Sequence, residues 1–523
     1  MTRAPAFTFV VLAALVLATG ARAADYTVAR DARLVEAAKR GETTTALALL
    51  PQLDPNGAEP DGTTPLHWAV RNNDLVLMAR LLGAGAAATA ANRYGMTPIF
   101  LACQNGSEEA LTRLLAAGVS PDTTGELGET ALMTCARTGK VAAAQVLIDA
   151  GASIDAVESW RGQTALMWAA SEGHADMVKA LARAGADVNA RSTIVVWERQ
   201  RTQEPRDKWL PPGGLTPLLL AAREGRVEAA KALLDNRADV NLVDPDRHTP
   251  LIMALINGHL DVAGLLIERG ADVNMADKVG RTALWATVDL HKVPSSNRPP
   301  PREYDDTLTS MEVIARLLDL GADVDAALRQ QVPYRTKLDR GGDGVLGAGT
   351  TPLLRAAKSA DIEVIRLLLK HGADATAETG NGVSAIMMAA NVSTREEDMT
   401  GRNKSQQDVI AAIRVLRTAG ADINGTDTQG RSAAHGAALW GLTDVVTFLH
   451  ETGGRIDLKD KRGFTPLDTA LGKSGGFGFD GRSSVVHEET AAAILELLGP
   501  GAETSNAPSA PLQERTQDDD PGR

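Results

Sequence analysis

The chain has 523 residues, of which 44% are hydrophobic but only 3% aromatic, and its formal net charge is −12. This acidic balance argues against a general nucleic-acid-binding protein, which needs a basic surface to neutralise phosphates. The few aromatic residues argue against a core built from large rings and favour short helices packed closely through Ala and Leu.

Residues 1–23 have the three parts of a secretory signal peptide. Arg3 lies near the start, residues 7–18 are apolar, and residues 21–23 read Ala-Arg-Ala, an A-x-A cleavage site. The apolar run is shorter than the roughly 20 residues that span a bilayer. We therefore expect export, to a periplasmic or extracellular location, and a mature chain that begins at Ala24. An uncleaved membrane anchor is the alternative.

Residues 31–50 have a helix-Gly-helix pattern with charged residues on the outer face, which is typical of a capping unit at the end of a repeat array. We assign residues 24–61 to this N-terminal cap.

Residues 162–190 define the unit that the rest of the chain repeats. Thr164 is placed to cap a short helix that Gly173 ends, and a second helix with one apolar face runs to Gly185. Helices shorter than roughly 12 to 15 residues are marginally stable alone. The unit is therefore expected to stack on copies of itself.

Such copies follow at a regular step. Six of the ten intervals are 33 residues and one is 34, while those of 52, 69 and 48 are the same unit with extra residues. The step is read from the residue before each Thr-Pro or Thr-Ala pair and its variants: Gly62, Gly95, Gly128, Gly162, Gly214, Arg247, Gly280, Gly349, Gly382, Gly430 and Gly463.

A 33-residue period with a T-P-L-H-x-A pattern is characteristic of ankyrin repeats, and TPLHWAV at residues 64–70 shows that pattern most fully. Over residues 30–499 the chain resembles the ankyrin-repeat family, and with its leader it resembles the secreted or periplasmic ankyrin-repeat proteins of bacteria. The resemblance implies an all-α solenoid of stacked helix-turn-helix units joined by β-turn fingers. In that register Trp68 and Trp168 are expected to be buried between layers.

Long insertions interrupt the repeats of residues 62–463. Two lengthen fingers, at residues 191–213 and 328–349, and two separate the helices of one repeat, at residues 291–310 and 393–407. The C-terminal repeat, residues 464–499, carries another at 472–489, and residues 500–523 have the composition of a disordered tail. By the ankyrin plan the finger insertions project from the concave side and the others share the opposite edge.

The inserted segments carry Trp, Tyr and Arg, the residues most enriched at binding hot spots, on an otherwise acidic body. We expect them to contact a protein partner; the alternative is that the rings only pin the loops to the array. The candidate partner-binding residues are Trp197, Arg199, Arg201, Arg206, Trp209, Tyr304, Tyr334 and Arg335.

Cys103 and Cys135 lie in the first helices of adjacent repeats at positions that differ by one residue. Stacked helices are 8 to 10 Å apart, whereas a disulfide needs α-carbons within about 7 Å. We expect two buried small hydrophobic residues.

The histidines do not suggest a catalytic site. His174 and His259 begin second helices, and His67 and His435 occupy the TPLH position, where ankyrin repeats use histidine structurally. No H-E-x-x-H or C-x-x-C motif occurs, and the G-x-G-x-x-G at residues 342–347 lacks the flanking strand and helix of a dinucleotide site. No cofactor and no metal site is predicted.

The fourth position of the helix-opening motif, His in the consensus, is apolar in eight successive repeats. An apolar residue there removes a hydrogen-bond donor and widens the hydrophobic band along the first helices, either for packing or as an apolar floor for a groove. These residues are Phe100, Met133, Met167, Leu219, Ile252, Trp285, Leu354 and Met387.

We therefore predict an exported, monomeric, non-catalytic scaffold that binds a protein partner through the concave face and the fingers, with no nucleic acid and no membrane insertion after cleavage. Two alternatives remain: a hydrolase or redox enzyme with a site built across the insertions from residues such as Asp305, Glu396 and His487, and a structural spacer of the cell envelope.

Overall fold

A computed structural model describes residues 32–196, 212–292, 306–332, 345–394, 404–474 and 485–500. The chain divides into two compact units, Met1–Ser159 and Trp160–Arg523. Throughout the described ranges the regular structure is helical, and β-pairing is limited to isolated bridges. The expected all-α fold of stacked helix pairs is confirmed.

Unit Met1–Ser159 is a stack of helix pairs. The first helices of its pairs are α1 (Arg33–Lys39), α3 (Pro65–Arg71), α5 (Pro98–Asn105) and α7 (Ala131–Thr138). The second helices are α2 (Thr43–Leu49), α4 (Leu75–Gly83), α6 (Glu108–Ala116) and α8 (Val141–Asp149), and the 3-10 helix η1 (Leu50–Gln52) follows α2.

Unit Trp160–Arg523 continues the same plan over more pairs. Its first helices are α9 (Ala165–Glu172), α11 (Pro217–Arg223), α13 (Pro250–Asn257), α15 (Ala283–His291), α17 (Pro352–Lys358), α19 (Ala385–Ala389), α21 (Ala433–Leu439) and α23 (Pro466–Ala470). Its second helices are α10 (Ala175–Arg183), α12 (Val227–Asp235), α14 (Leu260–Glu268), α16 (Ser310–Asp319), α18 (Ile362–Lys370), α20 (Gln406–Thr418), α22 (Thr443–Glu451) and α24 (Glu488–Leu498).

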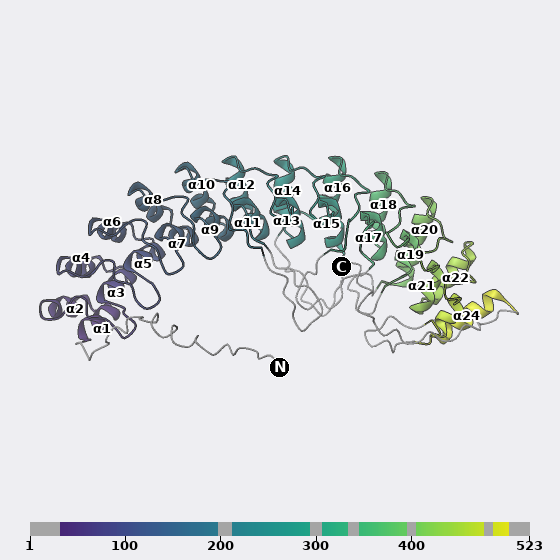
Figure 1. Ribbon diagram of the computed structural model, residues 1–523, viewed down its shortest axis with the longest axis horizontal. Helices are drawn as coiled ribbons and strands as arrows, with labels where there is room; N and C mark the ends of the chain where they lie inside the picture. Colours follow the sequence, from purple (N-terminus) through teal and green to yellow (C-terminus); the bar gives the residue numbers. More distant parts are fainter. Residues whose placement is uncertain are drawn as a thin grey trace, which may run out of the picture. The chain divides into compact units, whose positions relative to one another are not determined.

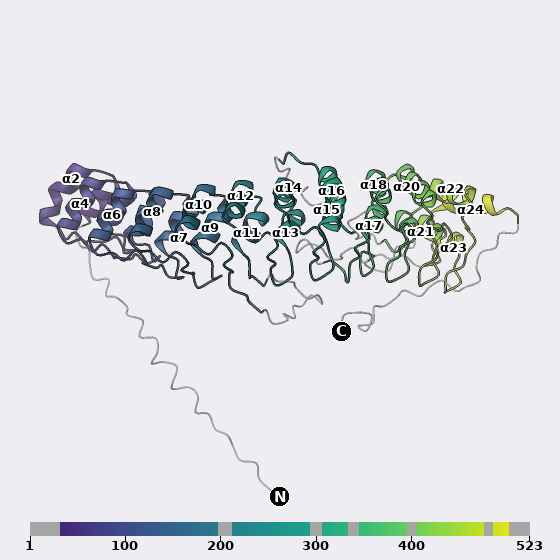
Figure 2. The ribbon, with the colours of Figure 1, turned by 90° about the horizontal axis from the view of Figure 1, so that it is seen from above.

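In this second unit the first helices follow one another in one row and the second helices in another (Figure 1). We use the word finger for the connection from the end of a second helix to the residue that opens the next first helix. The described fingers extend from the first-helix side of the two rows (Figure 2).

A Thr or Ser side chain begins each described first helix except α1, whose N-cap is Ala32. The Thr164 hydroxyl accepts a hydrogen bond from the Met167 N–H at 3.3 Å, as expected for an N-cap. Gly173 ends α9 with a left-handed backbone, φ +86°, which a residue with a Cβ adopts at a steric cost. The helix boundaries expected at these two residues are confirmed.

The core lies between the two helix rows. In the second helix of the 162–190 unit, Met177, Val178 and Leu181 have no exposed surface. The charged residues of α10, Asp176, Lys179 and Arg183, lie outside this buried face, which is the pattern of a helix that is stable only when it is stacked.

The expected burial of Trp68 and Trp168 between the layers is incomplete. Both side chains are half-buried. Trp68 lies against surface cations, 5.1 Å from Lys39 Nζ and 5.6 Å from the Arg71 guanidinium, and its indole N–H donates to Glu59 Oε2 at 2.7 Å. Among the tryptophans that the structure describes, the fully buried one is Trp285, one position earlier in the motif, because each step along a helix turns the side chain by about 100°.

Cys103 on α5 and Cys135 on α7 have no exposed surface, so their expected burial is confirmed. Both are free thiols, and burial together with the adjacent Cys135 thiol raises the pKa of Cys103 well above its ordinary value. The thiols are therefore neighbours in the interior of the first unit.

No helix within the described ranges is both long enough and apolar enough to cross a membrane.

Candidate protein-binding surface

The eight residues that the sequence singles out for partner binding all lie outside the described residues, in the segments 197–211, 293–305 and 333–344. Their role stays a prediction. The bases of the fingers that carry them are described, and so are the neighbouring fingers.

Six pairs of neighbouring fingers in the second unit are joined by single backbone hydrogen bonds; Pro245, which has no N–H, stands at the equivalent position of the finger after the hairpin. In each, an N–H near the tip of one finger donates to a carbonyl oxygen of the finger before it. The pairs are Thr193 to Arg161, Lys278 to Asp246, Arg329 to Val279, Gly380 to Ala348, Thr428 to Asn381 and Lys461 to Gln429, at 2.7 to 3.0 Å. The finger tips are thus held in a fixed order along one side of the unit.

A second ladder, of side chains, runs along the same fingers. At five junctions a carboxamide or carboxylate oxygen at the end of an A-D-x-N-like turn accepts the backbone N–H of the corresponding turn in the next repeat. The pairs are Asn189 with Asp239, Asn241 with Asp272, Asn274 with Asp323, Asp325 with Asp374 and Asn424 with Arg455, at 2.7 to 3.0 Å. The recurrence of AspValAsn in the sequence was a signal for this ladder. The sequence did not show the pairing, because each oxygen accepts from an N–H that is 31 to 50 residues further along the chain.

The finger that carries Trp197 and Trp209 leaves the array as a short antiparallel hairpin. Ile194 forms a bridge with Gly213, and the Val195 N–H donates to the Pro212 carbonyl at 2.7 Å. The two ends of the predicted insertion at 191–213 are therefore paired with each other. Residues 197–211, which lie between these ends, are outside the described residues.

Large apolar side chains are exposed on this hairpin base and on the finger before it. Trp160 is 67% exposed, Ile194 54% and Val196 90%. The Arg161 guanidinium lies 4.1 Å from the centroid of the Trp160 ring, in a cation–π contact. We call Trp160, Arg161, Ile194 and Val196 the tip cluster; it combines exposed apolar area with a stacked Arg, the composition of binding hot spots.

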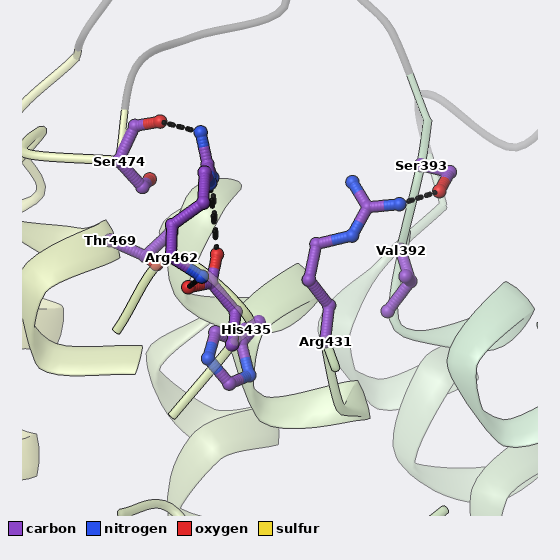
Figure 3. A pocket seen from close by; sticks show the side chains of 9 residues that line it. Val392, Ser393, Arg431, His435, Arg462, Thr469 and Ser474 are labelled. Atoms are coloured by element: carbon purple, nitrogen blue, oxygen red, sulfur yellow. Dashed lines mark hydrogen bonds and ion pairs between the residues drawn. The ribbon is translucent and has the colours of Figure 1, made fainter. Parts of the chain in front are cut away.

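A shallow pocket lies further along the second unit, between the fingers that precede α21 and α23 (Figure 3). The Arg431 Nε and Nη2 donate to Asp427 Oδ2, and Nη2 also to Ser393 Oγ at 2.6 Å. The Arg462 Nε and Nη2 donate to Asp460 Oδ2, and Arg462 Nη1 donates to the Ser474 carbonyl at 3.0 Å. The lining residues are Val392, Ser393, Arg431, His435, Gly436, Asp460, Arg462, Thr469 and Ser474.

Both guanidinium groups of this pocket are thus paired with an aspartate of their own finger. Such pairs fix the finger against the helix that follows it, and they leave the pocket close to electroneutral. The pocket contains none of the sequence-predicted binding residues.

Histidines at the TPLH position have the structural role expected of them. His67 Nδ1 accepts the Thr64 N–H at 3.1 Å, and Nε2 contacts the Met96 carbonyl at 2.9 Å. His435 makes the equivalent contacts to Ser432 and Phe464. Burial lowers the pKa of both histidines, although the bond to the carbonyl opposes this.

Histidines at the start of second helices join neighbouring repeats. His259 Nε2 contacts the Arg223 carbonyl at 3.0 Å, and His487 Nε2 contacts the Leu439 carbonyl at 3.0 Å. A Cβ on Gly225 would lie 2.4 Å from His259 Nδ1, which explains the glycine at the end of α11. His487, offered above as part of an enzyme site, is thus engaged in the same way as His259; Asp305 and Glu396 lie outside the described residues.

One buried ion pair escaped the sequence-based interpretation. Arg355 on α17 is 1% exposed, and its Nε donates to Asp289 Oδ1 on α15 at 2.6 Å. An Arg in the middle of a first helix is ordinarily placed at the surface. Its buried partner, Asp289, is 66 positions away in the chain, so only the folded structure shows the pair. Among the described residues no cluster of three or more His, Cys, Asp or Glu side chains could hold a metal ion.

Comparison with known proteins bears on the identity of these repeats. A family model for ankyrin repeats in three copies matches residues 34–124, 106–192 and 200–277, and a single ankyrin-repeat model matches residues 348–380. NF-kappa-B inhibitor delta of Mus musculus is 45% identical over 58 residues, 11% of this chain and 18% of that protein. Cyclin-dependent kinase 4 inhibitor B of Bos taurus is 30% identical over 125 residues, 24% of this chain and 83% of that protein.

Among solved structures, the crystal structure of the human ASB11 ankyrin repeat domain is 24% identical, with a TM-score of 0.38, over 46% of this chain and 98% of that one. With the first of the sequence relatives the chain shares less than a fifth of that protein's length. The family models, the second relative and the repeated cap–helix–glycine–helix geometry agree, and the chain belongs to the ankyrin-repeat family.

Proposed function

We propose that this chain is an exported scaffold that binds a protein partner through its fingers and the face made by its first helices. Ankyrin repeats generally mediate protein–protein interaction, and two relatives are named as inhibitors of protein targets. The observation that carries the proposal is the tip cluster, where Trp160 exposes 67% of its surface beneath a stacked Arg161.

Three features favour the tip cluster as part of an interface. Exposed aromatic and aliphatic groups that neighbour one another lose hydration when a partner covers them, at about 25 cal/mol per Å² of apolar surface. The cluster sits on fingers fixed by backbone hydrogen bonds, so little ordering is needed on binding. Beyond its base the hairpin continues into the segment that carries Trp197 and Trp209.

A site-specific cross-linker tests this assignment. A photoreactive phenylalanine analogue at position 196, in the full chain expressed in its native host, should cross-link a discrete partner, and Trp160→Ala should abolish that adduct. The same analogue at Val76, which is 61% exposed on α4, is the matched control. Equal cross-linking from both positions, or an adduct insensitive to Trp160→Ala, would contradict the proposal.

The finger insertion itself is tested by a Trp197→Ala, Trp209→Ala variant. If these rings contact the partner, affinity should fall by about 2 kcal/mol or more per ring while the melting temperature stays constant. Rings that pin the loop to the array would instead lower the melting temperature and leave affinity alone. Replacement of residues 196–211 by a two-residue turn keeps the paired ends, Val195 and Pro212, and gives the same readout for the whole segment.

Export is the second part of the proposal and rests on the composition of residues 1–23. N-terminal sequencing of the exported protein is expected to read Ala-Asp-Tyr. An intact leader in a membrane fraction would instead indicate an anchored protein.

A further inference from the structure

Three side chains from two neighbouring repeats lie close together in the second unit, at the edge where the first helix of a repeat ends and its second helix begins. Ser310 Oγ lies 2.6 Å from His291 Nδ1, and His291 Nε2 lies 3.6 Å from Asp361 Oδ2. His291 is the last residue of α15, Ser310 the first of α16, and Asp361 the N-cap of α18. The sequence offers no motif for this arrangement, because 19 and 51 residues separate its members.

The neighbours of the two ring nitrogens favour one tautomer of the His291 imidazole. Asp361 Oδ1 accepts the Val364 N–H at 3.3 Å as a helix cap, so that Oδ2 is the oxygen that faces His291. At 3.6 Å this contact is too long for a hydrogen bond, but a carboxylate only accepts, so its nearness favours a proton on Nε2 and leaves the lone pair of Nδ1 to accept from the Ser310 hydroxyl. This is the arrangement in which a serine hydroxyl gives its proton to a histidine that a carboxylate orients.

The position of His291 is fixed by the buried Arg355. Besides its ion pair with Asp289, Arg355 Nη2 donates to the carbonyls of Asp289 at 3.2 Å and of Lys292 at 3.4 Å. These bonds hold the last turn of α15 on both sides of His291. Arg355 therefore acts as a positioning residue for the imidazole.

The position of Ser310 is fixed from the preceding repeat. Asp261 accepts the N–H groups of Thr307 and Leu308 at 2.9 to 3.0 Å, and Asp306 accepts the Asp261 N–H in return. Thr309 then caps α16 with Glu312 in a capping box. These bonds lower the pKa of Asp261 although burial opposes them.

The three groups are reachable from solvent to different degrees. Ser310 is partly exposed, the His291 side chain is 20% exposed and that of Asp361 5%. The nucleophile is thus accessible and the carboxylate shielded, so the charge of Asp361 acts on the imidazole at reduced dielectric screening.

We propose that Ser310, His291 and Asp361 form an acyl-transfer site that hydrolyses carboxylic esters. Ser310 Oγ attacks the ester carbonyl carbon while its proton passes to His291 Nδ1. The tetrahedral intermediate collapses, the alcohol leaves with the proton from His291, and the acyl group stays on Ser310. Water, deprotonated by His291, then attacks the acyl-serine, releases the carboxylic acid and restores the Ser310 hydroxyl.

The start of α16 also supplies donors for the developing oxyanion. The backbone N–H groups of Ser310 and Met311 make no hydrogen bond within the part of the chain that the structure describes, as is usual for the first turn of a helix. They lie beside the nucleophile at the positive end of the helix dipole, where negative charge on the carbonyl oxygen is stabilised. The proposal adds a catalytic activity to the proposed binding role.

The test uses the full mature chain, a fluorophosphonate probe and p-nitrophenyl acetate. We expect the probe to label Ser310, located by mass spectrometry of the digested protein, and the ester to be hydrolysed faster than by buffer. Ser310→Ala should abolish both. Ser171→Ala, which removes a partly exposed serine of α9, is the matched control and should change neither.

Asp361→Asn separates catalysis from structure, because Asn caps α18 as well as Asp does but carries no charge. We expect its labelling rate to fall by about 100-fold, because His291 acts as a weaker general base once no carboxylate stabilises the imidazolium, with an unchanged circular dichroism spectrum and melting temperature. The proposal is overturned if the folded wild-type chain shows no more labelling at Ser310 than at Ser171. It is also overturned if Asp361→Asn or His291→Gln labels at the wild-type rate.

Discussion

The indole Nε1–H of Trp285 donates a hydrogen bond to the backbone carbonyl of Thr350 at 3.2 Å, and the Trp285 side chain has no exposed surface. The same bond to the next repeat is made by His67 Nε2 to Met96 and by His435 Nε2 to Phe464. The interpretation of Trp285 as a purely apolar replacement for His is therefore wrong, because its ring keeps the donor and reaches the same carbonyl.

Replacement of this tryptophan should destabilise the second unit strongly. Trp285→Ala removes a fully buried ring and one of the two donors to the Thr350 carbonyl, which also accepts the Leu328 N–H, so the free energy of unfolding should fall by about 3 to 5 kcal/mol. Urea unfolding followed by circular dichroism measures the change. Trp168→Ala is the control: its ring is half-buried, and the expected loss is about 1 to 2 kcal/mol. Equal losses of unfolding free energy in the two variants would contradict the deeper burial of Trp285.

The buried histidines should make stability depend on pH. Burial holds the pKa of His435 below its ordinary value of 6.5, so the unfolded chain binds more protons as the pH falls below about 6.5. Stability is therefore complete above that pH and declines toward the lower folded-state pKa, by at most about 1.4 kcal/mol per pH unit per histidine.

His435→Met, which introduces the residue found at Met133 and Met167, should reduce this decline. The measurement is the urea midpoint at pH 8 and at pH 5 for wild type and variant. His450→Gln changes an exposed histidine of α22 and should leave the wild-type pH dependence intact. A His435→Met chain that loses as much stability as wild type between these pH values would contradict the assignment.

The anchor between Asp261 and residues 306–308 should depend on the carboxylate charge. Hydrogen bonds from Thr307 and Leu308 lower the pKa of Asp261 in the folded state, against the effect of burial. Its contribution is therefore present above the unfolded value of about 3.9 and is lost as the pH falls below it. Asp261→Asn should cost about 1 to 3 kcal/mol at pH 7 and much less at pH 3.

The matched control for this variant is Asp176→Asn. Asp176 lies at the corresponding position of α10, but its side chain is 84% exposed and its partner is the surface residue Lys179. Exposed pairs of this kind contribute roughly 0 to 1 kcal/mol. A comparable loss in both variants would show that the Thr307 and Leu308 bonds add nothing.

The two cysteines should be inert in the folded protein. Cys103 and Cys135 have no exposed surface, and the raised pKa of Cys103 keeps it as the unreactive thiol. A chromogenic disulfide reagent should therefore titrate no thiol in native buffer and two in denaturant. Rapid reaction of either cysteine in native buffer, or a mass 2 Da below that of the reduced chain, would be incompatible with two buried free thiols.

Much of the repeat geometry could be predicted from the sequence because it is set by neighbours in the chain. Thr164, Gly173 and the apolar face of α10 act over one or two helical turns, so their spacing carries the information. The burial of a single ring depends on its position within a helical turn. Trp168 and Trp285 differ by one motif position, yet Trp168 is half-buried and Trp285 fully buried.

The sequence by itself determined the 33-residue period, the helix ends and the repeat family, since these follow from local caps and helical periodicity. The tertiary structure alone decided which distant residues meet. Arg355 finds Asp289 across 66 residues, and His291 lies between Ser310 and Asp361, because stacking brings equivalent positions of successive repeats to within a few ångströms of each other whatever the length of chain inserted between them. Insertions of variable length hide such pairs from any fixed spacing, and only the packed array shows them.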